Sequence, residues 1–133
     1  MQITAQVTNT AASHAVQVTT AGQAKPLAIA GRAGGGSAVN GGEFLMLALA
    51  TCYCNDLYRE AARLQIELTA VAVEACAEFD GIGLAARDVT YRARIESPAS
   101  PELIDQLLRE TDAVAEVHNT LRAGAQVRRL PWA

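Results

Sequence analysis

One long stretch, from Gly41 to about Leu64, constrains the fold of this chain more than any other. Its first half, residues 44–51, is apolar on all sides, whereas its second half carries polar side chains along one stripe. The helix that this pattern predicts would be roughly 33 Å long. We therefore expect it to be the central element of a small chain, covered on every side along residues 44–51.

Alternating and β-branched residues predict strands on both sides of this helix. The predicted strands cover residues 2–8, 14–20, 26–30, 67–79 and 87–96. The last two flank the turn Asp80-Gly81-Ile82-Gly83, so we expect them to pair as an antiparallel hairpin. A loop with six glycines, residues 31–42, leads into the long helix.

The last third of the sequence predicts two short helices and a strand. Ser100 is a candidate N-cap and Pro101 suits the first position of a helix that runs to about Arg109. A second helix, Asp112–Leu121, and a final strand, Ala125–Leu130, are expected to follow. Hairpins and clustered strands in this order are typical of an α+β fold.

Composition limits the classes of protein to consider. A length of 133 residues fits a single domain, residues 1–133, and a hydrophobic content of 50% supports a packed core. A net charge of −3 without a dense Lys/Arg run argues against nucleic-acid binding. The longest apolar run, Phe44–Ala50, is too short for a membrane span. Three cysteines without a secretory segment predict free thiols and a cytoplasmic location.

Two of the cysteines lie on the long helix, but the helical period separates them. Cys52 shares a stripe with Asp56 and Arg59, whereas Cys54 lies about 200° away on the helical wheel. Residues two apart do not face each other, so the pair is neither a redox couple nor a two-thiolate metal site, and we expect no metal. Arg59 would favour a Cys52 thiolate and Asp56 would oppose it. Spacing alone leaves open whether Cys52 is reactive or a small core residue.

The other two cysteines are expected to be inert. Cys54 shares its stripe with apolar residues and is expected to fill the core. Cys76 lies on the polar face of its strand between Glu74 and Glu78, which would raise its thiol pKa. We expect it to be a partly exposed bystander.

The run Asn40-Gly41-Gly42-Glu43-Phe44-Leu45-Met46-Leu47-Ala48-Leu49-Ala50-Thr51-Cys52 resembles the central-helix signature of the OsmC/Ohr family. In those proteins Asn-Pro-Glu or Pro-x-Glu opens a long helix, and a small-small-Cys triplet follows. Gly31-Arg32 and the glycines after it resemble the loop arginine of the family. The resemblance covers nearly the whole chain and implies an OsmC-like fold and an intertwined homodimer.

Many members of that family are thiol peroxidases that reduce organic hydroperoxides or hydrogen peroxide. By position, Cys52 matches their peroxidatic cysteine, Arg32 the arginine that activates it, and Glu43 the carboxylate that orients the arginine. The resemblance implies no cofactor, because the thiolate itself is the nucleophile. Glu43 is also explained as a charge in the first helical turn, and Arg32 as a surface charge.

The chain departs from the family pattern at the second cysteine. Ala115 falls where the resolving cysteine is expected, and Glu116 replaces the proline after it. Gly41-Gly42 replaces the opening proline, so a stricter register would place the orienting glutamate on Gly42. His118, one turn beyond, would either face the same cavity as an acid, base or ligand-binding group, or be structural.

Three hypotheses follow from these residues. The first is a one-cysteine thiol peroxidase in which Cys52 attacks a hydroperoxide and an external thiol reductant restores it. The alternative is a non-catalytic OsmC-like dimer that binds a small apolar or electrophilic ligand in its interface pocket. The third is that Cys52 only packs and the protein is a structural or interaction partner.

Overall fold

The long helix is present and begins with a capping box. In the computed structural model, which describes residues 1–132, helix α1 covers Gly41–Arg63. The Asn40 Oδ1 accepts a hydrogen bond from the Glu43 N–H at 2.8 Å, and Glu43 Oε1 accepts one from the Asn40 N–H at 3.0 Å. This reciprocal pair satisfies two helix-end donors, so α1 starts at Gly41 without the proline of the family signature.

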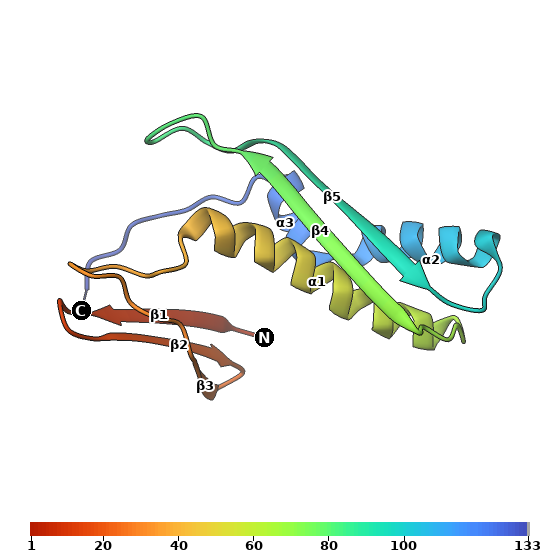
Figure 1. Ribbon diagram of the computed structural model, residues 1–133, viewed down its shortest axis with the longest axis horizontal. Coiled ribbons are helices and arrows are strands. Elements are labelled where there is room, and N and C mark those ends of the chain that lie inside the picture. Colours follow the sequence, from red (N-terminus) through yellow and green to blue (C-terminus); the bar gives the residue numbers. More distant parts are fainter. Residues whose placement is uncertain (133) are drawn as a thin grey trace. The chain divides into compact units, whose positions relative to one another are not determined.

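The described chain divides into two compact units, Met1–Phe44 and Leu45–Ala133, and each is treated by itself. The first unit holds a three-stranded antiparallel sheet in the order β1-β2-β3, seen in red to orange in Figure 1. The strands are β1 (Ile3–Asn9), β2 (His14–Thr20) and β3 (Gln23–Leu27). The single-domain interpretation of residues 1–133 remains a prediction.

The third strand starts earlier than the predicted Pro26–Ala30. Ala21 and Gly22 both have positive φ angles, 48° and 81°, which is the backbone of a two-residue hairpin turn. The chain is therefore already extended at Gln23, where β3 begins. Pro26 is tolerated because β3 is an edge strand.

The second unit packs α1 against a hairpin and two further helices (Figure 1). The hairpin joins β4 (Ala70–Glu78) and β5 (Arg87–Glu96), antiparallel as predicted, and burial alternates along β4. Helices α2 (Pro101–Val114) and α3 (Glu116–Ala123) follow. The buried core cluster consists of Tyr53, Leu57, Ala61, Ile66, Leu107 and Ala115. The mixture of antiparallel strands and helices confirms the α+β class.

The C-terminal elements differ from the prediction. Ser100 caps α2 by accepting a hydrogen bond from the Leu103 N–H, as expected, but α2 continues past Arg109 to Val114. The helix breaks at Ala115, where ψ is 104°, so the expected helix Asp112–Leu121 is divided between α2 and α3.

The predicted final strand, Ala125–Leu130, is wrong. Val127 and Leu130 suit a strand by type, but they are 97% and 73% exposed, and no strand pairs with this segment in the described part of the chain. A strand requires a neighbour for its backbone hydrogen bonds, and this segment has none there.

The surface of α1 adds two observations. Leu47, which lies in the apolar stretch 44–51, is 57% exposed, and Tyr58, further along the helix, is 49% exposed. Within residues 1–132, no helix combines the length and the apolar character that a membrane span requires.

Candidate functional site around Cys52

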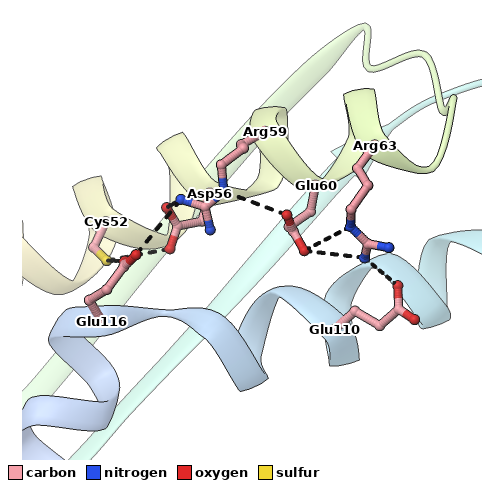
Figure 2. Close-up of polar contacts among 7 residues, drawn as sticks. All are labelled: Cys52, Asp56, Arg59, Glu60, Arg63, Glu110 and Glu116. Atoms are coloured by element: carbon pink, nitrogen blue, oxygen red, sulfur yellow. Dashed lines mark hydrogen bonds and ion pairs between the residues drawn. The ribbon is translucent and has the colours of Figure 1, made fainter.

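Cys52 meets two carboxylates, one from its own helix and one from α3. Its Sγ lies 3.7 Å from Asp56 Oδ2, one turn along α1, and 3.8 Å from Glu116 Oε2 at the start of α3. Figure 2 shows both carboxylates directed towards the sulfur. An ionised carboxylate only accepts hydrogen bonds, so the Cys52 thiol is the donor, and its single hydrogen points to one carboxylate at a time.

This environment opposes the thiolate. Burial raises the pKa of Cys52 first of all, and the charges of Asp56 and Glu116 raise it further, against the opposing effect of a backbone hydrogen bond at Val117. Burial and the charge of Glu116 also raise the pKa of Asp56. A hydrogen bond from its own backbone N–H lowers the pKa of Glu116, with Arg59 acting in the same direction.

Arg59 forms ion pairs with the carboxylates around Cys52. Its guanidinium lies 2.9 Å from Asp56, 3.5 Å from Glu60 and 3.8 Å from Glu116. Arg63 continues the row by pairing with Glu60 and with Glu110 of α2 (Figure 2). Asp56 raises the pKa of Cys52, which is the direction that the sequence predicted, and Arg59 forms its ion pairs with the carboxylates.

The other cysteines lie outside this cluster. Cys76 is exposed, as predicted. Cys54 is half-buried and, contrary to the expectation, is not among the side chains packed on the core cluster, whereas Cys52 is. The buried stripe of α1 runs through Leu49, Tyr53, Asp56, Leu57, Glu60 and Ala61, which places Cys52 at its edge.

Glu116 lies beside Cys52 and directly follows Ala115, the position where the family resemblance led us to expect the second cysteine. Ala115 is fully buried, and the Glu116 carboxylate reaches the sulfur. Sequence reasoning noted Glu116 only as the residue in place of a proline and missed its contact with the thiol. The one signal for that contact was its position next to the expected partner of Cys52.

One set of donor atoms has a composition suited to a cation. Among residues 1–132, ligand atoms of Cys52, Asp56 and Glu116 lie within 4.8 Å of one another. A thiolate with two carboxylates suits a zinc-like ion in type, but Arg59 already supplies positive charge to both carboxylates. The sequence prediction of no metal considered only the two thiols of α1 and did not weigh this set.

His118 lies in an aromatic cluster. Its ring is 4.5 Å from that of Tyr91 and 5.6 Å from that of Tyr53, and neither ring nitrogen has a hydrogen-bond partner. The residue is 3% exposed, and burial lowers its pKa, so it is neutral at neutral pH. It lines an open hollow of ≈ 260 Å³ together with Leu49, Val89, Thr90, Tyr91, Leu121 and Arg122. Cys52 is not among the lining residues.

Arg32 and Glu43 both belong to the first unit. The Arg32 backbone N–H donates to the Gly36 carbonyl at 2.8 Å, and its guanidinium packs over Gly36, where a Cβ would meet it at 3.1 Å. The Glu43 carboxylate takes part in the capping box with Asn40. Within the described part of this unit, no ion pair joins Arg32 to Glu43. Their roles towards Cys52 therefore remain predictions.

A model of the OsmC-like protein family matches residues 34–128, which is more than half of the chain. None of the curated proteins matches the chain significantly.

Several solved structures share this fold, and three of them illustrate the likeness. An OsmC-like protein from Mycoplasma pneumoniae is 15% identical at a TM-score of 0.62, with 91% of this chain and 89% of that one covered. An OsmC-like hydroperoxide resistance protein from a Jannaschia species is 15% identical at a TM-score of 0.58, with 87% and 81% covered. An OsmC-like protein from Vibrio cholerae is 12% identical at a TM-score of 0.55, with 90% and 93% covered. At such identities the likeness establishes the fold.

Proposed function

The chain belongs to the OsmC-like protein family, and from this premise we propose that it is a stress or redox protein that reduces hydroperoxides through the single thiol of Cys52. The observation that carries the proposal is the position of Cys52. It lies at the edge of the buried stripe of α1, with its sulfur 3.7 Å from the Asp56 carboxylate and 3.8 Å from the Glu116 carboxylate.

The reaction needs only the thiol, a hydroperoxide and a reductant. The sulfur attacks one peroxide oxygen, an S–O bond forms and the O–O bond breaks, which gives a sulfenic acid and an alcohol. Because Ala115 stands in place of a second cysteine, a small external thiol completes the cycle. One thiol forms a mixed disulfide and releases water, and a second restores Cys52 and leaves as a disulfide.

The proposal is tested by hydroperoxide consumption. Wild-type protein and Cys52→Ser are incubated with tert-butyl hydroperoxide or hydrogen peroxide and an excess of dithiothreitol. We expect consumption above the uncatalysed rate by wild type and not by Cys52→Ser. The matched control Cys76→Ser should retain full activity, because Cys76 is an exposed residue of strand β4. Equal rates from wild type and Cys52→Ser exclude the proposal.

Arg32 and Glu43 enter the proposal as positioning groups for this thiol. A guanidinium near the sulfur would favour the thiolate and polarise the O–O bond. Arg32→Ala is expected to reduce peroxide consumption, whereas Arg92→Ala, which removes an exposed arginine paired with Glu74 on the hairpin, is the control. Equal losses from both variants would mean that Arg32 has no special role.

A second candidate function is the binding of a small apolar or electrophilic ligand, with His118 as its polar contact. The hollow beside His118 favours this function. Buried polar groups normally have hydrogen-bond partners, but neither ring nitrogen of His118 has one, so a bound ligand could supply it. Native mass spectrometry of freshly purified protein and titration with 8-anilinonaphthalene-1-sulfonate test this candidate. Leu121→Arg, placed at the lining of the hollow, is expected to abolish binding of that probe. Undiminished binding by Leu121→Arg excludes the hollow.

The proposal also includes a homodimer in the cytoplasm. The exposed Leu47 and Tyr58 on α1 support a partner that covers this helix, and free cysteines suit a reducing compartment. Sedimentation equilibrium of wild type and Leu47→Arg tests the dimer. We expect twice the chain mass for wild type and a shift towards one chain mass for the variant.

A further inference from the structure

We propose that Asp56 and Glu116 form a proton relay for Cys52, an inference that rests on the thiol-peroxidase function proposed above. In the usual one-cysteine scheme the nucleophile is a preformed thiolate. Here the two carboxylates take the thiol proton while the sulfur attacks the peroxide and then return it to the leaving oxygen.

The Cys52 thiol is a hydrogen-bond donor with two carboxylate acceptors near it. Sγ lies 3.7 Å from Asp56 Oδ2 and 3.8 Å from Glu116 Oε2, and the donor atoms of all three groups lie within 4.8 Å of one another. Asp56 is 5% exposed, whereas 71% of the Glu116 side chain is open to solvent. One acceptor is therefore fixed beside the sulfur, and the other connects the cluster with water.

The charges around the thiol explain why a relay is needed. Asp56 and Arg59 face it from α1 and Glu116 faces it from α3, and Arg59 is drawn to the carboxylates. Burial and both carboxylates raise the pKa of Cys52, so the thiol form dominates at neutral pH. The pKa of Asp56 is itself raised, which makes its carboxylate a better base than an ordinary one.

The proposed step balances. The S–O bond forms as the O–O bond breaks, so the sulfur is oxidised to a sulfenic acid and the hydroperoxide is reduced to an alcohol. The thiol proton moves to the Asp56–Glu116 pair, which works as a relay only with both carboxylates present, and from there to the departing alkoxide oxygen. An alkoxide is a poor leaving group, so its protonation in the transition state accelerates the reaction.

Two reactions of the same sulfur separate a relay from a simple charge effect. Iodoacetamide alkylation requires a thiolate, but iodide leaves without a proton. Hydroperoxide reduction requires both removal of the thiol proton and its delivery to oxygen. Glu116→Gln removes a negative charge and should lower the pKa of Cys52, so alkylation becomes faster. A preformed thiolate would make peroxide reduction faster as well, whereas a relay makes it slower.

The experiment measures both second-order rate constants near pH 7 on the full chain in a Cys54→Ala/Cys76→Ala background, with a chelator present to exclude bound metal. Glu116→Gln and Asp56→Asn are compared with Glu110→Gln, which removes a carboxylate that pairs with Arg63 and does not contact Cys52. We expect the ratio of peroxide rate to alkylation rate to fall about tenfold or more in the first two variants and to stay constant in the third. Because Asp56 is buried and could be required for folding, Glu116→Gln alone is sufficient for the test.

The outcomes for the two proposals differ. An unchanged or increased ratio in Glu116→Gln, with a wild type that consumes peroxide through Cys52, overturns the relay and leaves the peroxidase. A wild type that consumes no peroxide, although Cys52 is alkylated, overturns the proposed function and the relay with it.

Discussion

At the scale of single residues, the neighbours of a side chain decide its chemistry more than its type does. Cys52 is a free thiol on a family-matching helix, yet burial and two carboxylates raise its pKa. His118 is a titratable ring, yet burial between Tyr53 and Tyr91 keeps it neutral. Both residues were identified from the sequence, and so was Asp56, but Glu116 beside Cys52 and the two tyrosines beside His118 come from segments far along the chain.

The thiol pKa of Cys52 is the first prediction at this scale. We expect pH-dependent alkylation of the Cys54→Ala/Cys76→Ala protein to show a midpoint above the ordinary value of 9.0. The physical reason is burial, with added repulsion from Asp56 and Glu116. A midpoint well below 9.0 would show that a cation from outside this cluster reaches the sulfur.

The pH dependence of stability supplies a second prediction. Burial holds the pKa of His118 below the unfolded value of 6.5, so the unfolded chain binds this proton more tightly. The contribution of His118 is therefore fully present above pH 6.5 and is lost as pH falls from there towards the folded pKa. Urea unfolding between pH 7.5 and 5 should show a slope, at most about 1.4 kcal/mol per pH unit, that His118→Gln removes and His14→Gln keeps.

At the scale of elements, local sequence patterns predicted most of the helices and strands. The apolar pattern predicted α1 within one residue, and Ser100-Pro101 predicted the start of α2. The break at Ala115 was missed because it carries neither glycine nor proline, and burial of Ala115 in the core fixes it instead. The contact between Glu116 and Cys52 depends on this break, so it could not be predicted from local sequence.

The capping box of α1 supplies the prediction at this scale. Asn40→Ala removes the acceptor for the Glu43 N–H and should lower the free energy of unfolding by about 1 kcal/mol in chemical denaturation. Glu43→Gln keeps an oxygen for the Asn40 N–H and should cost less. If Glu43→Gln nevertheless abolishes peroxide consumption without loss of stability, its charge acts beyond the cap.

At the scale of the whole molecule, family and fold are better determined than chemistry. The OsmC-like family model covers residues 34–128, and the α+β elements agree with related structures. The final strand, Ala125–Leu130, failed because strand pairing is a long-range property that residue types do not encode. The proposed dimer and the proposed reductant likewise involve other molecules, which the sequence of one chain does not describe.

The core of the second unit gives a prediction for the molecule as a whole. Leu107 is fully buried and joins α2 to Tyr53, Leu57 and the strand residues around them. Leu107→Ala should cost about 2–5 kcal/mol in denaturant unfolding. Hydrogen exchange should then show lost protection in α1, α2 and β5, whereas exposed Leu103→Ala should change protection little.

In the proposed peroxidase reaction, the carboxylates beside Cys52 would also affect further oxidation of its sulfenic acid. Without an internal disulfide to shelter it, a sulfenic acid meeting excess peroxide is prone to a second oxidation, which is usually irreversible. The product of that second step is a sulfinate, and its permanent negative charge would sit against Asp56 and Glu116. In the proposed peroxidase, the repulsion that opposes ionisation of the Cys52 thiol would therefore also oppose formation of that sulfinate.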